Sequence, residues 1–91
     1  MVLGDNEISR LFRGCTGGFG GAAKTAQGRR RLLRDGLDMR CRGYRIAQPL
    51  FDILQAGGLV LGGYAHEPVR LTNRGAQFLE YEKRALYRRV A

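Results

Sequence analysis

Residues 45–81 read RIAQPLFDILQAGGLVLGGYAHEPVRLTNRGAQFLEY, and this stretch predicts a helix, a short hairpin and a second helix. Apolar residues recur at helical spacing from Ile46 to Leu54. Because proline is tolerated in the first turn of a helix but not in its interior, Pro49 restricts the regular helix to Gln48–Ala56. Gly57-Gly58 then supplies the positive φ at which a helix can end without strain.

The remainder of this stretch predicts a two-stranded hairpin and a final helix. The β-prone runs Leu59–Leu61 and Val69–Leu71 flank a turn-like segment at 62–68. Thr72 lies where a helix cap belongs, and apolar residues continue at helical spacing over Asn73–Arg89. Helix, hairpin and helix therefore follow one another without a long connection.

Two pieces of this stretch resemble segments of the winged helix-turn-helix family. Ala56-Gly57-Gly58-Leu59-Val60 is similar to the exit of the family's recognition helix. Residues 69–79 are similar to its wing-to-last-helix segment, of the form Y-R-L-T-x-x-G-x-x-[FL]-L. The two pieces have the family's usual separation, and the resemblance covers about residues 44–82. It implies an α+β fold, mostly helical: a winged helix-turn-helix with a two-stranded wing and a C-terminal helix.

A chain of 91 residues is expected to form one domain. Asp5 can cap a first short helix that ends by Gly14. Glycines crowd residues 14–21, where no helix is expected, and Phe19 is the one side chain able to anchor that loop. The expected parts are an N-terminal helix with the glycine-rich loop (1–23), the helix-turn-helix with its wing (24–75) and the C-terminal helix (76–91).

The segment ahead of the recognition helix has two interpretations. In the first, Ala22–Asp35 is a helix that Gly28 weakens by roughly 1 kcal/mol relative to alanine and that Gly36 stops. Asp38–Gly43 is then the connection into the recognition helix. In the second, Asp38–Tyr44 forms a short helix of its own, and the sequence leaves both open.

The chain is strongly basic, with a formal net charge of +8 and a sequence pI of about 10.5. Eight basic and two acidic residues lie within 24–45, and four basic and no acidic residues lie within 83–91. Such a balance indicates a polyanionic partner, most commonly nucleic acid. Together with the resemblance, it predicts a small transcription regulator that binds duplex DNA through the helix starting near Arg45 and Gln48.

Candidate contact residues follow from this interpretation. Arginine can pair with guanine and glutamine with adenine in the major groove, so the candidate base readers are Arg42, Arg45 and Gln48. The candidate phosphate contacts are Lys24, Arg29, Arg30, Arg31, Arg34, Arg40 and Tyr44. The candidate wing residues are Tyr64, His66 and Arg70. The candidates for packing against a second copy in a homodimer are Tyr81, Leu86, Tyr87 and Val90.

Two other functions stay open. Winged-helix domains with a similar L-T-x-x-G segment occur in archaeal-type ribosomal proteins, so the resemblance also allows RNA binding. A protein-interaction adaptor on the same scaffold is the third possibility, because a fold alone does not fix a function.

No pattern in the sequence predicts an enzyme, a metal site, a cofactor or a small-molecule ligand. Cys15 and Cys41 lie in no Cys-x-x-Cys pair, and His66 is distant from both. Gly18–Thr25 nearly matches the phosphate-binding motif G-x-x-x-x-G-K-[ST], but Ala23 replaces the second glycine and no buried strand precedes it. No apolar run approaches the ~18 residues of a membrane span, and no signal peptide is seen, so we expect an intracellular protein without membrane contact.

Overall fold

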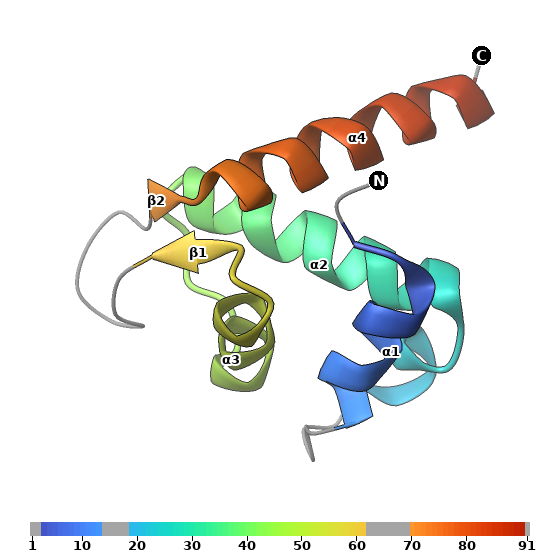
Figure 1. The fold of residues 1–91 in the computed structure, drawn as a ribbon, viewed down its shortest axis with the longest axis horizontal. Coiled ribbons are helices and arrows are strands. Elements are labelled where there is room, and N and C mark those ends of the chain that lie inside the picture. Colours follow the sequence, from blue (N-terminus) through green and yellow to red (C-terminus); the bar gives the residue numbers. More distant parts are fainter. Residues whose placement is uncertain (1–2, 14–18, 62–69, 91) are drawn as a thin grey trace.

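The computed structural model describes residues 3–13, 19–61 and 70–90 of the chain, and side chains as far as residue 87 (Figure 1). Its elements are α1 (Asp5–Arg13), the 3-10 helix η1 (Gly20–Ala23), α2 (Ala26–Cys41), α3 (Gln48–Ala56), β1 (Val60–Leu61), β2 (Arg70–Leu71) and α4 (Asn73–Val90). The described part is therefore mostly helical, with four α-helices and one small antiparallel sheet.

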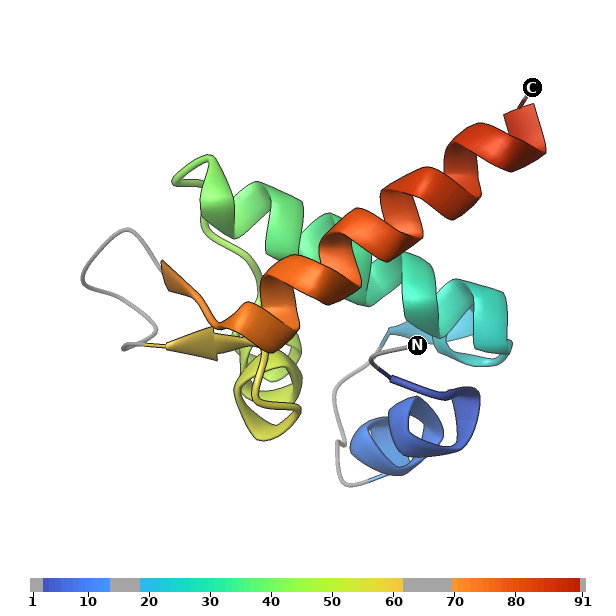
Figure 2. The same ribbon diagram turned by 45° about the horizontal axis from the view of Figure 1, so that its top comes forward.

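Helix α2 lies at the centre of the molecule. Helix α4 covers one side of α2, and α1 and α3 lie on the other (Figure 1). Helix α4 crosses α2, and its C-terminal half extends past the crossing (Figure 2). The hairpin lies at the end where α2 finishes and α4 begins, with Val60 paired to Leu71 and Leu61 to Arg70.

The hydrophobic core joins all four α-helices and the first strand. Each large apolar side chain that leaves water contributes about 1.5–3 kcal/mol, so α3, with four such side chains, supplies much of the core. The buried apolar residues are Leu3, Ile8, Leu33, Leu37, Ile46, Leu50, Phe51, Ile53, Leu54, Leu59, Val60, Phe78 and Leu79.

The predicted bounds of α3 are confirmed. Pro49 lies in its first turn, where the missing N–H costs no hydrogen bond. At the other end Gly58 takes a φ of +70°. The Gly58 N–H donates to Gln55 O at 3.0 Å and the Leu59 N–H to Leu54 O at 3.0 Å, which satisfies the last carbonyls of the helix.

Both interpretations of the segment before α3 are wrong, because α2 is one helix that starts later and ends later than expected. It starts after Thr25 and runs through Gly36 without interruption. Gly36 is buried, and a Cβ there would lie 3.0 Å from Leu50 Cδ2. The close approach of α2 and α3 requires a small residue at this point, and it outweighs the weak helix propensity of glycine. The helix ends instead at Cys41, and Gly43, two residues further on, takes a φ of +86°.

Helices α2 and α4 begin with the same local arrangement, which carries the pattern T-x-x-G. The Thr25 hydroxyl accepts a hydrogen bond from the Gly28 N–H at 2.9 Å, and the Thr72 hydroxyl accepts one from the Gly75 N–H at 2.9 Å. In both cases a Cβ on the glycine would overlap a preceding backbone carbonyl oxygen. A Cβ at Gly28 would lie 1.9 Å from Ala22 O, and a Cβ at Gly75 would lie 2.0 Å from Leu59 O. Gly28, read from the sequence as a weakness, is therefore a packing requirement.

The N-terminal segment packs on this frame through aromatic and aliphatic contacts. Ile8 of α1 is buried, and Phe12 meets Phe19 edge to face with ring centroids 5.4 Å apart. The expected anchoring role of Phe19 is confirmed. Gly20–Ala23 nevertheless form a 3-10 turn, which includes Gly20 and Gly21, where no helix was expected; residues 14–18 lie outside the described part.

Replacing Gly75 with alanine should destabilise the protein, because the new methyl group meets the Leu59 carbonyl. Relieving the overlap requires α4 to shift, and we expect a loss of about 2–3 kcal/mol in the free energy of unfolding, measured by urea denaturation. Gly21→Ala is the matched control, since nothing lies within 4 Å of a Cβ there. Equal stability of the two variants would contradict the close approach.

Candidate nucleic-acid interface

The connection 42–47 leads from α2 into α3, and Ile46 is its one buried residue. Tyr44 is 60% exposed and Arg45 is exposed, whereas Ile46 is 7% exposed and joins the core. The Arg40 guanidinium donates from Nη1 to the Tyr44 carbonyl at 2.9 Å, which ties the connection to α2. The connection therefore has a buried anchor, and its polar side chains lie on the surface.

Four exposed side chains lie along this connection and the start of α3, and we call them the connection surface: Arg42, Tyr44, Arg45 and Gln48. Arg42 is 68% exposed at its side chain and lies 3.4 Å from Asp38. Gln48 is the first residue of α3, whose N-cap residue Ala47 makes no side-chain hydrogen bond to the helix. The three predicted base readers are thus all accessible, with Arg42 at the end of α2 and Gln48 at the start of α3.

Acidic groups border this surface on two sides. Asp38 contacts both Arg42 and Lys83, the latter at 3.1 Å. Asp52 is exposed, one turn beyond Gln48 on α3, and forms no ion pair with another described residue. Asp52 leaves uncompensated negative charge next to the surface, so it would oppose a polyanion there.

Arg40 is not available for phosphate contact, which corrects the sequence interpretation. It is 6% exposed, and its guanidinium carbon lies 5.9 Å from the centre of the Phe51 ring. With its hydrogen bond to Tyr44, this arginine stabilises the junction between α2 and α3. Arg40 follows the buried Leu33 and Leu37 at helical spacing, and this pattern in the sequence could have identified it as an internal residue.

Arg30 is also structural. Its Nε contacts Asp5 at 2.7 Å, its Nη1 contacts Glu82 at 2.7 Å and its Nη2 donates to the Leu3 carbonyl at 2.8 Å. The guanidinium therefore joins α1, α2 and α4. Burial alone lowers the pKa of Arg30, but the hydrogen bonds to Glu82 and Asp5 outweigh burial, and the pKa is raised.

The remaining basic candidates on α2 are dispersed. Arg29 is half-buried and donates to Ala23 O at 3.0 Å, which holds η1. Arg34 pairs with its neighbour Asp35 at 3.1 Å, and Arg31 is exposed. Lys24 is exposed ahead of α2. Residues 29–45 therefore do not form one continuous basic face.

The hairpin contributes one described candidate. Arg70 on β2 is exposed, and the hairpin lies at the same end of the molecule as the connection surface (Figure 1). Tyr64 and His66 lie outside the described residues. Of the wing candidates, the structure therefore locates only Arg70, at the base of the hairpin.

The dimer candidates on α4 do not share one face. Tyr81, Leu86 and Tyr87 are 42%, 41% and 77% exposed. At about 100° per residue, Tyr81 lies roughly 140° from Leu86 and roughly 120° from Tyr87 around the helix. The Val90 side chain lies outside the described part. A homodimer through α4 therefore stays a prediction.

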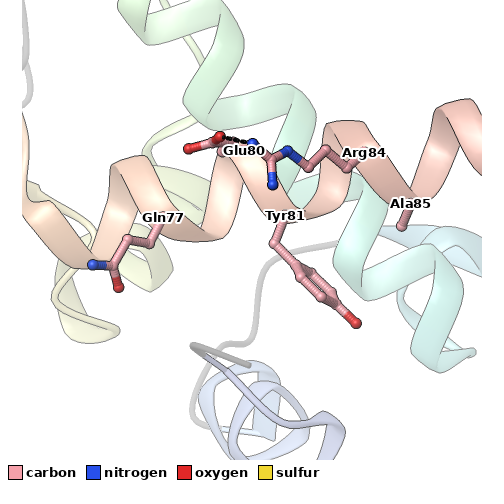
Figure 3. Close-up of a pocket in the computed structure, with 5 residues that line it drawn as sticks. All are labelled: Gln77, Glu80, Tyr81, Arg84 and Ala85. Carbon is pink, nitrogen blue, oxygen red and sulfur yellow. Dashed lines mark hydrogen bonds and ion pairs between the residues drawn. The ribbon is translucent and has the colours of Figure 1, made fainter.

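Tyr81 borders a shallow hollow of about 220 Å³ on α4, shown in Figure 3. The hollow is lined by Gln77, Glu80, Tyr81, Arg84 and Ala85, and Arg84 pairs with Glu80 across it. The pair is exposed and internally neutral. The lining offers no nucleophile with a neighbouring base, so it does not indicate a catalytic site.

Among the described residues, no three of the His, Cys, Asp and Glu side chains gather as metal ligands, and no helix is both long and apolar enough to span a membrane. Comparison of the chain with family models, curated proteins and solved structures finds no match. The interpretation of the connection surface therefore depends on its own geometry.

Replacing Arg30 with alanine should lower the free energy of unfolding by about 3 kcal/mol, because Glu82 would be left buried without its cation. The measurement is urea denaturation near neutral pH. Arg84→Ala is the matched control, since it breaks an exposed pair and should cost less than about 0.5 kcal/mol. If both variants lost the same amount, Arg30 would not join the helices.

Cys41 lies at the surface at the end of α2, and its thiol pKa is raised above the ordinary value. Partial burial is the largest cause and the Asp38 carboxylate the second, with Lys83 acting in the opposite direction. A raised pKa favours the neutral thiol in the folded state. The Cys41 thiol therefore contributes fully to the free energy of unfolding at pH values below its pKa in the unfolded chain. This contribution is lost as the pH rises through its pKa in the folded protein.

In a Cys15→Ser background, alkylation of Cys41 by iodoacetamide should reach half its maximal rate at a higher pH when the protein is folded than when it is unfolded in urea. Asp38→Asn should shift the folded midpoint back to lower pH by removing the neighbouring negative charge. Identical folded and unfolded midpoints would contradict the raised pKa.

Proposed function

We propose that this chain binds nucleic acid, and in particular duplex DNA, through the connection surface at the start of α3. The observation that carries the proposal is the exposure of Arg42, Tyr44, Arg45 and Gln48 along the connection and the first residue of α3, while the apolar side chains of α3 are buried. Arginine and glutamine are the side chains that read base edges most directly, and tyrosine can contact phosphate through its hydroxyl.

The order of the elements supports a winged-helix interpretation of this surface. Helix α2, the connection and α3 would be the helix-turn-helix, β1 and β2 the base of the wing, and α4 the last helix. In that arrangement the N-terminal residues of the second helix enter the major groove. Arg70, exposed on β2, would lie on the flanking backbone.

The balance of charge also supports a polyanionic partner. Six of the eight acidic residues pair with a described Lys or Arg within 4 Å, so their charge is compensated inside the protein. Six exposed basic residues form no ion pair with another described residue, and these are Arg10, Arg13, Lys24, Arg31, Arg45 and Arg70. Among the described residues, Asp52 is the one unpaired acidic group, so the net uncompensated charge at the surface is positive.

The decisive experiment compares a duplex selected by this protein from a random library with an unselected duplex. Arg45→Ala combined with Gln48→Ala should weaken binding to the selected duplex by roughly 100-fold, since each bidentate base contact contributes about 1–3 kcal/mol. Binding to the unselected duplex should fall only several-fold, through the lost phosphate attraction. Fluorescence anisotropy across a salt titration gives both affinities.

The matched control replaces the same residue types on α4, with Gln77→Ala combined with Arg84→Ala, and should leave both affinities nearly unchanged. Equal losses on the two duplexes would mean that Arg45 and Gln48 read no bases. Tighter binding of structured RNA would favour the ribosomal-type alternative. Absence of salt-dependent binding to either nucleic acid would favour a protein-interaction adaptor.

A further inference from the structure

A second surface lies where α4 extends past its crossing with α2, away from the connection surface. A groove between the two helices is lined by Gln27, Arg30, Arg31, Arg34, Glu82, Ala85 and Leu86. Its floor is the pair formed by Arg30 and Glu82, whose side chains are 15% and 9% exposed. Because Arg30 and Glu82 already pair with each other at 2.7 Å, their side chains need not rearrange when a ligand enters the groove.

The wall contributed by α4 is apolar. Leu86 is 41% exposed, although Leu79, two turns earlier on the same face of the helix, is only 9% exposed. The stripe that packs in the core at Leu79 thus continues into the groove beside Ala85. An apolar side chain entering there would cover Leu86 and remove it from water.

The wall contributed by α2 is polar and cationic. Gln27, Arg31 and Arg34 are spaced four and three residues apart, so they lie on one face of α2. Arg31 is exposed and forms no ion pair with another described residue. The Arg34 side chain is 18% exposed and pairs with its sequence neighbour Asp35, which is 57% exposed, so the pair can be reached from the solvent on the Asp35 side.

From these features we propose that the groove between α2 and α4 docks an acidic, apolar segment of a partner protein, with its leucine-like side chains on Leu86 and Ala85 and its carboxylates on Arg31 and Arg34. An amphipathic helix laid in a groove makes both kinds of contact at once. A nucleic-acid backbone would use the arginines but leave the apolar wall uncovered. The proposal is independent of DNA binding at the connection surface.

The probe is a fluorescein-labelled, helix-forming peptide built of leucine and glutamate at helical spacing. Binding is measured by anisotropy, and the site is mapped by amide chemical shifts. The peptide should bind the full chain and shift the amides of residues 27–34 and 85–86 without moving those of 42–48. A peptide with glutamine in place of glutamate should bind roughly tenfold more weakly, since charge-assisted hydrogen bonds to arginine are lost.

Two single variants separate the polar from the apolar contribution. Arg31→Glu should weaken binding of the acidic peptide by roughly tenfold or more, and Leu86→Ala should weaken it by roughly fivefold. Both positions are exposed, so the variants should remain folded, which circular dichroism checks. Arg84→Ala removes an exposed arginine elsewhere on α4 and should leave binding unchanged.

Four outcomes would overturn the proposal. In the first, the peptide fails to bind. In the second, Arg31→Glu and Arg84→Ala weaken peptide binding equally, which would indicate only a general attraction to a basic protein. Duplex DNA could displace the peptide and shift the same groove amides, which would make nucleic acid the occupant. Self-association abolished by Leu86→Ala would make the occupant a second copy of the chain.

Discussion

The backbone of Leu59 is the point on which the rest of the fold depends. The Thr72 N–H donates to the Leu59 carbonyl at 3.1 Å, and the Thr72 hydroxyl donates to the Gly58 carbonyl at 2.6 Å. Gly75 allows the first turn of α4 to lie directly against that same Leu59 carbonyl. The end of α3, both strands and the start of α4 are thereby joined within a few residues. Since α4 then crosses α2, the direction in which it leaves this junction determines where α3 and the connection surface lie relative to the rest of the molecule.

The second half of the chain could be predicted from the sequence because its signals are local. A proline in a first turn, a glycine with positive φ and a capping threonine each act over three or four residues, and they gave the bounds of α3 and the start of α4. The interruption expected at Gly36 was wrong for a physical reason. Helix propensity costs about 1 kcal/mol at a glycine, whereas the contact with Leu50 that favours glycine there is made across the fold and is invisible in a local window. The start of α2 was missed although Thr25 and Gly28 repeat the pattern that correctly indicated Thr72.

In the candidate interface, too, local signals identified some residues, whereas contacts made across the fold decided the role of others. Arg42, Arg45 and Gln48 were predicted to be accessible because they flank a helix start, and they are exposed. A count of charges could not show that Arg30 and Arg40, unlike these residues, are held inside the fold. Arg30 meets a carboxylate 52 positions away in the sequence, and Arg40 is held by a carbonyl and an aromatic ring. A net charge of +8 indicates a polyanionic partner but does not say which arginines are free to meet it, because a guanidinium serves equally well as an internal tie between helices.

Helix α2 also sets the distance between the two proposed surfaces. The groove uses its N-terminal half, around Arg31, and the connection surface begins beyond its C-terminal end, at Arg42. Eleven residues of helix separate these two positions by about 16 Å, and α2 is fixed at both ends, by Thr25 and by Gly43. The two proposed surfaces are therefore separate along α2. If both proposals hold, an acidic protein segment in the groove and nucleic acid at the connection surface would occupy different parts of the same helix.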